Sequence, residues 1–184
     1  PGHFFTTREI AEATQAEVIV GDLNDSFIGI SIDSRTVRRG DVFICIKGER
    51  FDGHDFIPEA IAKGASCIIF SRYNAILLGS KIPANLIAVE NTLSALSGLA
   101  YFHRKRFDIP IIGISGSNGK TTTKEMVFSL LSAKYNVLKN EGTQNNLIGL
   151  SLSLLRLRAH HELAVLELGT NHFGEIRELT RIAA

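Results

Sequence analysis

The residues best suited to chemistry lie between positions 111 and 123, where an apolar run enters a glycine-rich turn and then a predicted helix. The turn has the spacing G-x-x-G-x-x-G-K-T. Glycines allow a backbone to fold around an anion with its N–H groups pointing inward, and the N-terminus of a helix adds a favourable dipole. Lys120 brings a positive charge to the β- and γ-phosphates, and the Thr121 hydroxyl suits Mg²⁺. The segment predicts a nucleoside triphosphate site formed by Ser115, Gly116, Ser117, Asn118, Gly119, Lys120, Thr121 and Thr122.

The turn departs from the commonest phosphate-binding loop, which has a glycine where this chain has Ile114. A dinucleotide-binding turn requires G-x-G, which this turn lacks, and it would not explain the pair Lys120-Thr121. The simpler interpretation is a glycine-rich turn with a solvated lysine. We favour the phosphate site because strand, turn and helix all agree with it.

A carboxylate, Glu167, follows the apolar run 163–166. In a parallel sheet the carboxyl ends of the strands line the ligand crevice, so Glu167 is expected beside the glycine-rich turn. There it could hold a Mg²⁺ ion that bridges the nucleotide and an acceptor. The alternative is a charge that emerges into water at the end of a strand. Because the phosphate-binding turn lies upstream, we favour the metal role and predict Thr121 and Glu167 as the metal ligands.

Two polar loops offer further contacts. The stretch 140–146 is rich in amides that suit phosphate or carboxylate groups; the alternative is helix capping, with Asn145 as the N-cap. The loop 169–175 contains His172, which could meet a phosphate or a second metal but could equally be an ordinary polar residue.

Hydrophobic patterning predicts an α/β protein in two parts. Residues 1–84 form a small α/β domain, and residues 85–184 begin a β-α-β series whose apolar strands predict a parallel sheet covered on both faces. The loop at 78–83 is the candidate border, and the second part reads as an incomplete domain of the P-loop ATPase-like kind. We expect strands at 28–32, 42–46, 66–70, 86–89, 111–115, 136–138 and 163–168, and helices at 6–13, 57–63, 92–106, 120–133, 146–157 and 174–183.

Composition narrows the function classes. The chain has 184 residues, 45% hydrophobic and 21% charged, as expected of a globular protein with a core. A net charge of +1 gives no reason to expect nucleic acid or an anionic membrane as a partner, and no apolar run approaches ~20 residues. Cys45 and Cys67 lie in apolar runs and are expected to be free buried thiols of a cytoplasmic protein. The basic cluster 103–106 suits the C-terminal end of a helix better than a phosphate patch.

Taken together, these residues resemble the Mur ligase family. The resemblance covers nearly the whole chain, with an ATP loop at 113–126, an asparagine motif at 143–150, a segment with the Mg²⁺-binding glutamate at 167–176, and parts of a UDP-binding domain at 33–35, 40–43 and 47–56. The order Glu-Leu-Gly followed by Asn-His-x-Gly-Glu-Ile is similar to the member that handles D-alanyl-D-alanine. The Ser-Ser-His typical of the ligase that adds the third residue is absent after Glu167.

The resemblance implies an ATP- and Mg²⁺-dependent amide ligase with three domains, of which this chain would hold the first and about half of the second. Its partners would be UDP-N-acetylmuramoyl-tripeptide and D-alanyl-D-alanine, and a cytoplasmic monomer is expected. Lys120 and Glu167 would be catalytic. Asn145 and Asn146 would join the nucleotide contacts, and the substrate would meet Ser34, Arg35, Lys47, Gly48, Thr143 and His172.

Other functions remain open from the sequence. A sister amide ligase, such as the UDP-muramoyl-dipeptide ligase or a folylpolyglutamate synthetase, would use the same loop. A P-loop switch or a module that only binds the UDP substrate would also fit parts of the pattern. Without the resemblance, Ser34 and Arg35 would be interpreted as a turn with a surface charge.

Overall fold

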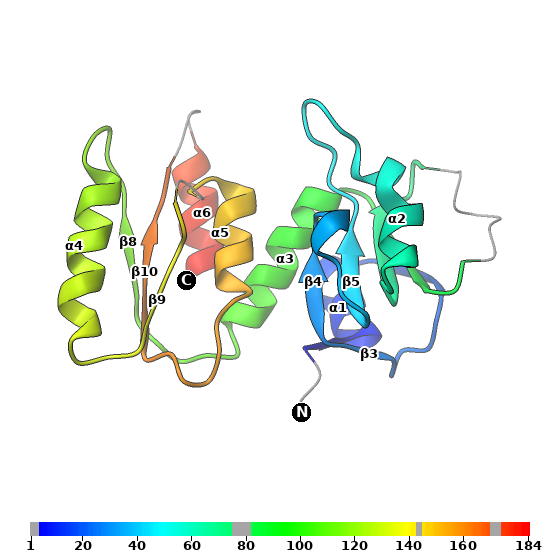
Figure 1. The fold of residues 1–184 in the computed structure, drawn as a ribbon, viewed down its shortest axis with the longest axis horizontal. Coiled ribbons are helices and arrows are strands. Elements are labelled where there is room, and N and C mark those ends of the chain that lie inside the picture. Colours follow the sequence, from blue (N-terminus) through cyan, green and yellow to red (C-terminus); the bar gives the residue numbers. More distant parts are fainter. Residues whose placement is uncertain (1–3, 75–81, 143–144, 170–173) are drawn as a thin grey trace. The chain divides into compact units, whose positions relative to one another are not determined.

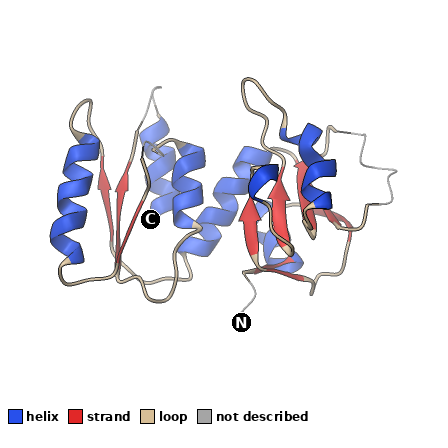
Figure 2. Cartoon of the chain, in the orientation of Figure 1, coloured by secondary structure: helices blue, strands red, loops and turns tan. Residues whose placement is uncertain are grey.

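The computed structural model describes residues 4–74, 82–142, 145–169 and 174–184 (Figure 1). The chain forms two compact units, Pro1–Leu96 and Ser97–Ala184. Both are mixed α/β units built on a sheet with parallel strands (Figure 2), as the sequence predicted.

The first unit is built on a five-stranded sheet with the order β2-β7-β6-β5-β4. Four strands run parallel, and β2 pairs antiparallel with β7. The strands are β2 (Glu17–Val20), β4 (Gly29–Ser31), β5 (Asp41–Ile44), β6 (Cys67–Ser71) and β7 (Asn85–Val89). A separate antiparallel pair joins β1 (Phe5–Thr6) to β3 (Ser26–Phe27). The short strands β1, β2 and β3 were not predicted, because they lack a sustained apolar alternation.

The core of the first unit follows from its central strands, which are apolar and buried on both faces. Phe43 on β5 and Phe70 on β6 are almost fully buried. Cys45 and Cys67 are both buried and free, as predicted, and burial raises the pKa of each thiol far above its usual value. Both thiols are therefore protonated and unreactive at physiological pH.

The helices of the first unit are short and well capped. Helix α1 (Thr7–Thr14) begins with the predicted capping box, in which Thr6 and Glu9 bond reciprocally. Two short 3₁₀ helices, η1 (Ser34–Thr36) and η2 (Gly53–Phe56), follow β4 and β5. Helix α2 (Ile57–Ala62) ends just before Gly64, as expected. Because η1 lies between them, β4 and β5 pair in parallel and do not form a hairpin.

The border between the units lies further along the chain than the predicted division at 84/85. Strand β7 is paired on both sides within the first sheet, so residues 85–89 complete the first core. The two units divide between Leu96 and Ser97, inside helix α3 (Thr92–Arg104). The predicted border at 78–83 was wrong because the chain returns to the first sheet as β7 after these residues.

The second unit contains a three-stranded parallel sheet with the order β8-β10-β9. Helix α4 covers one face and α5 and α6 lie on the other (Figure 1), which confirms the predicted parallel sheet with helices on both sides. The elements are β8 (Ile111–Ile114), α4 (Lys120–Ser132), β9 (Val137–Lys139), α5 (Leu147–Leu154), β10 (Leu163–Glu167) and α6 (Glu175–Ala183). None of the helices within the described ranges is long and apolar enough to cross a membrane.

The basic cluster at the end of α3 is partly buried. Arg104 is 9% exposed, and its guanidinium donates to the carbonyl oxygens of Phe107, Ile109 and Ala183. It thereby joins the turn before β8 to the end of α6. His103 is 3% exposed and its Nε2 lies 3.1 Å from the Leu157 carbonyl oxygen, so the ring donates this bond.

We expect the 184-residue chain to lose stability as the pH falls below 6.5. Burial lowers the pKa of His103 from 6.5 to about 4, so between these values the unfolded chain takes up a proton that the folded chain does not. The free energy of unfolding should fall by on the order of 3 kcal/mol across this window. Urea unfolding between pH 8 and 4 measures the effect.

The matched variants are His103→Gln, whose amide can still donate to Leu157, and His160→Gln at an exposed position. His103→Gln should flatten the pH dependence, and His160→Gln should leave it in place. An unchanged profile in His103→Gln would contradict the assignment.

Candidate functional site

The candidate site lies where the three parallel strands of the second unit end. The central strand β10 ends at Glu167, which pairs in register with Ile114 at the end of β8. On the other side, β9 ends at Lys139 beside Val165. The loops after β8 and β9 therefore both leave the sheet next to Glu167. The predicted phosphate loop and the asparagine-rich loop are brought to one carboxylate by this strand order.

The phosphate loop is an exposed turn that leads into α4. Gly116 (φ 149°) and Gly119 (φ 74°) adopt positive φ, where a side chain would be strained. Gly119 is the N-cap of α4 and has no side chain that could accept from the first turn, so those N–H groups are available to an anion. The Lys120 ammonium donates to the Gly116 carbonyl at 2.6 Å and folds back over the loop. This arrangement is suited to binding phosphate groups.

Glu167 is the centre of the site and is only 2% exposed. Its Oε2 accepts from Thr121 Oγ1 at 2.8 Å, and its Oε1 accepts from Asn145 Nδ2 at 2.8 Å. The alternative of a charge emerging into water is thus wrong. Mg²⁺ takes octahedral oxygen ligands at 2.0–2.1 Å, which places neighbouring ligand atoms roughly 2.9 Å apart. The spacing of Thr121 Oγ1 and Glu167 Oε2 fits two such positions around one ion.

The two asparagines of the second loop make different contacts, and the structure corrects the suggestion that Asn145 is the N-cap. Asn145 is not the N-cap of α5, because its side chain is bonded to Glu167. The N-cap is Asn146, whose Oδ1 accepts from the Gly149 N–H at 2.9 Å. Its side-chain oxygen is therefore engaged in capping. The predicted contacts at Thr143 and His172 lie outside the described residues.

Two further residues of the site were not singled out from the sequence. Asn140 bonds to the backbone of Glu167 through both ends of its amide, and Lys124 bonds to the carbonyl oxygen of Asn140. The sequence signal for both was weak. Asn140 is a single amide in a polar stretch, and Lys124 is a lysine within a helix.

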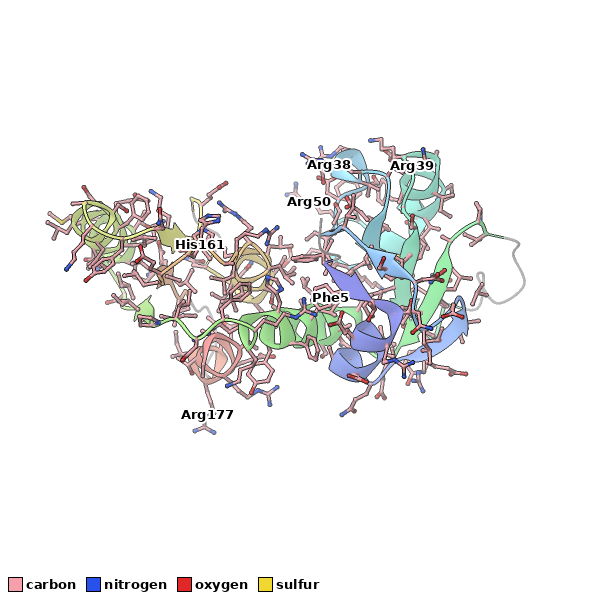
Figure 3. The ribbon with its side chains drawn as sticks, turned by 90° about the horizontal axis from the view of Figure 1, so that it is seen from below. Phe5, Arg38, Arg39, Arg50, His161 and Arg177 are labelled. Atoms are coloured by element: carbon pink, nitrogen blue, oxygen red, sulfur yellow. The ribbon has the colours of Figure 1, made fainter. Side chains whose placement is uncertain are left out.

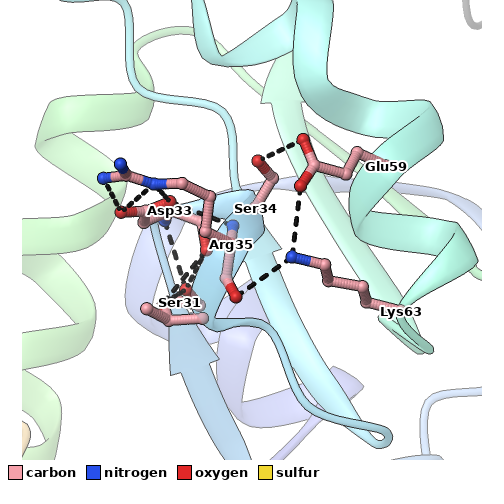
Figure 4. A network of polar contacts seen from close by, with 7 residues as sticks. Ser31, Asp33, Ser34, Arg35, Glu59 and Lys63 are labelled. Atoms are coloured by element: carbon pink, nitrogen blue, oxygen red, sulfur yellow. Dashed lines mark hydrogen bonds and ion pairs between the residues drawn. The ribbon is translucent and has the colours of Figure 1, made fainter.

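In the first unit, Ser34 and Arg35 lie after β4 in a network of polar contacts (Figure 4). Ser34 donates to Glu59 Oε2 at 2.9 Å, and Arg35 forms a bidentate pair with Asp33. Lys63 pairs with Glu59 and donates to the Arg35 carbonyl oxygen. The hydrogen bond from Ser34, with that from Lys63, lowers the pKa of Glu59. Ser34 is buried and its hydroxyl is engaged, whereas the Arg35 side chain is 81% exposed.

A separate cavity of about 410 Å³ opens at the carboxyl ends of β5, β6 and β7. Lys47 lines this cavity, whereas Ser34 and Arg35 do not. Gly48 closes a turn by donating to the Phe51 carbonyl oxygen. In the wall of this cavity, the Ser71 N–H donates to His54 Nε2, and the Nδ1 atom of the same ring faces Asp52 Oδ1 at 2.5 Å. The lining residues are Lys47, Asp52, His54, Ser71, Tyr73, Asn74, Glu90, Asn91, Thr92 and Leu93.

Two further arginines of the first unit, Arg38 and Arg39, lie away from the cavity. Arg38 and Arg39 are exposed and extend outward into solvent (Figure 3). They precede β5 and so lie near the amino ends of the parallel strands, opposite the cavity. They are not part of either candidate site.

The fold and the site define a P-loop nucleotide-binding unit that follows a small α/β unit. Two family descriptions match this division: "Mur ligase family, catalytic domain" covers residues 26–104, and "Mur ligase middle domain" covers residues 114–184. The chain belongs to the Mur ligase family.

Curated relatives agree with this placement. The chain is 44% identical over 162 residues to the UDP-N-acetylmuramoyl-tripeptide–D-alanyl-D-alanine ligase of Treponema pallidum, with 85% of this chain and 35% of the relative covered. It is 38% identical over 181 residues to the ligase of the same name from Bacillus subtilis, with 97% and 38% covered. The chain therefore spans little more than a third of the length of these relatives.

Solved structures show the same fold. MurF from Acinetobacter baumannii superposes with a TM-score of 0.89 at 35% identity, covering 97% of this chain and 39% of that one. MurF ligase from Thermotoga maritima in complex with ADP gives a TM-score of 0.74 at 40% identity, covering 84% and 35%.

We predict that Gly169→Ala disrupts the site although it changes neither of the two predicted metal ligands. A Cβ at Gly169 would lie 2.4 Å from Asn145 Cγ, so the Asn145 amide would have to leave Glu167. Losing such a partner of a metal ligand typically weakens metal affinity about 10- to 100-fold. Titration of Mg²⁺ against a fluorescent ATP analogue bound to the full-length protein measures this loss.

The control is the double variant Gly169→Ala/Asn145→Ala. If the glycine acts through Asn145, the double variant should be no weaker than Asn145→Ala alone. Additive losses would show that the glycine acts by another route.

Proposed function

We propose that the full-length protein is an ATP-dependent amide ligase that adds D-alanyl-D-alanine to UDP-N-acetylmuramoyl-tripeptide in the synthesis of peptidoglycan precursors. The observation that supports this most directly is the cluster of Thr121, Asn145 and Glu167 beside the phosphate loop. The curated relatives carry this activity in their names. A cytoplasmic monomer is part of the proposal.

Amide formation from a carboxylate requires activation, because a carboxylate is a poor acceptor for an amine. The tripeptide carboxylate attacks the γ-phosphate and forms an acyl phosphate with release of ADP. The amine of D-alanyl-D-alanine then attacks the acyl carbon, and phosphate leaves from the tetrahedral intermediate. Both steps place negative charges close together, so the site must supply cations and N–H donors.

The residues of the second unit meet this demand. The N–H groups at the start of α4 and the Lys120 ammonium bind the β- and γ-phosphates, once Lys120 releases the Gly116 carbonyl. Thr121 and Glu167 would hold Mg²⁺, and the ion would supply positive charge beside the transferred phosphoryl group. Asn145 orients Glu167 by donating to its second oxygen. Ser115, Ser117, Asn118 and Thr122 are proposed as further contacts of the exposed loop.

The first unit is proposed to bind the UDP end of the substrate. Arg35 is exposed and can meet the diphosphate, while Ser34 keeps its oxygen lone pairs as acceptors after donating to Glu59. Lys47 adds a positive charge to the lining of the cavity, where both ring nitrogens of His54 are engaged by Asp52 and Ser71.

A second candidate function is a P-loop switch that hydrolyses ATP slowly without an acceptor. The burial of Glu167 supports the ligase, because both of its side-chain oxygens are already bonded within the protein, Oε2 to Thr121 and Oε1 to Asn145. The deciding experiment measures ADP release by the full-length protein with ATP and Mg²⁺ alone, then with UDP-muramoyl-tripeptide, and then with D-alanyl-D-alanine as well. A ligase requires the acceptor carboxylate and forms the pentapeptide product; acceptor-independent hydrolysis would refute the proposal. Folates in place of the muramoyl peptide test the folylpolyglutamate alternative.

We expect Lys120→Ala in the full-length protein to lower ligase turnover by several orders of magnitude. The ammonium is proposed to bind the γ-phosphate, and in the folded chain it donates to the Gly116 carbonyl oxygen of the same loop. The variant should therefore fold normally, as circular dichroism would show. Lys105→Ala, an exposed lysine outside the site, is the control and should keep native turnover. Near-native turnover in Lys120→Ala would remove this residue from the mechanism.

A further inference from the structure

Two fully buried polar side chains lie beneath the candidate site and have no role in the reaction described above. They are Lys124, in the second turn of α4, and Asn140, directly after β9; both are 0% exposed. Burying an ammonium group is costly, and an apolar side chain of similar length would fill the same space without that cost. The contacts of these two residues therefore call for an explanation.

Asn140 contacts one residue through both ends of its amide. Its Oδ1 accepts from the Glu167 N–H at 2.9 Å, and its Nδ2 donates to the Glu167 carbonyl oxygen at 3.0 Å. The backbone pairing of β9 and β10 ends before this point, at Lys139 and Val165. The Asn140 side chain thus replaces the missing strand on that side and fixes the backbone of the acid.

Lys124 connects the helix of the phosphate loop to the same place. Its ammonium donates to the Asn140 carbonyl oxygen at 3.1 Å and approaches the Gly142 carbonyl oxygen at 3.5 Å. Its charge is balanced by Glu125 at 3.2 Å, which is also paired with Lys139. Lys124 stands three residues after Thr121, so both side chains leave the same face of α4.

The two residues complete a closed set of contacts around Glu167. Thr121 reaches its carboxylate from α4, and Lys124 reaches Asn140 from the same helix face. Asn140 in turn holds the backbone of Glu167. A shift of α4 relative to the end of β10 would have to break both connections together.

We propose that Lys124 and Asn140 are positioning residues that keep Thr121 and Glu167 at the separation needed to share one Mg²⁺ ion. This inference rests on the proposed function, because it takes the metal–nucleotide site as given. Neither residue touches the nucleotide. Their effect is on metal affinity, which depends on the distance between the two ligand oxygens.

The test measures metal affinity directly in the full-length protein. Free Mn²⁺ is followed by electron paramagnetic resonance during titration in the presence of a non-hydrolysable ATP analogue. Lys124→Met removes the charge and keeps the length of the side chain. It should weaken Mn²⁺ binding about 10- to 100-fold, the usual effect of removing a group that orients a metal ligand. Nucleotide affinity measured in EDTA should change little, since the phosphate loop is intact.

Two further readouts separate positioning from simple stabilisation. Turnover of Lys124→Met should recover at high Mg²⁺ concentration, because the site is weakened but retained. Lys134→Met, an exposed lysine just after the same helix, is the matched control and should bind Mn²⁺ like the native protein. A folded Lys124→Met with native metal affinity and a lowered melting temperature would show a merely structural role and overturn the proposal.

Asn140→Asp decides the question if Lys124→Met does not fold. It keeps the size and the Oδ1 acceptor but loses the Nδ2 donor to Glu167. An added negative charge alone would tighten the binding of a cation, so weaker Mn²⁺ binding must come from the lost position. Equal or tighter binding would overturn the proposal. If the native protein binds no Mn²⁺ together with the nucleotide, the proposed function fails. If the native protein binds Mn²⁺ and the variants bind it equally well, only this inference fails.

Discussion

The arrangement of the second unit depends on one carboxylate, Glu167, at the end of the central strand of a parallel sheet. A parallel sheet directs the carboxyl ends of all its strands to one edge. With β10 between β8 and β9, the loops that follow the two outer strands must pass on either side of this acid. Thr121 and Asn145 reach it from those loops or their helices, one to each oxygen. The strand order by itself therefore brings the residues of the candidate site together.

Much of this unit could be predicted from local patterns. The apolar strands, the glycines at positive φ and the lysine after them are short-range signals, and the structure places them within a residue or two of the predicted bounds. The position of Glu167 could be predicted because it is the last residue of an apolar strand, and the strand end places it at the edge of the sheet. The same holds for the capping box of Thr6 and Glu9, where both partners are close in sequence.

The remaining features depend on contacts between distant segments, which a single sequence does not show. Asn145 and Asn146 are identical in type and adjacent, yet one bonds to Glu167 and the other caps α5, because the turn of the backbone directs them apart. Lys124 has the composition of a surface helix residue and is fully buried. The border of the first unit was placed too early because β7 pairs in the sheet with β2 and β6, and the sequence does not show this pairing.

The phosphate loop and Glu167, the two parts of the candidate site, differ in solvent exposure. The phosphate loop is open, and Lys120 is held there only by a carbonyl oxygen of the same loop. Glu167 is buried, and its backbone and both side-chain oxygens are already bonded. The proposed entry of a nucleotide would displace the half-buried Lys120 side chain from its own loop and would leave the core in place. If Thr121 and Glu167 hold a metal as proposed, these side chains are already ordered by folding, so that the binding energy of the nucleotide is left for the transition state.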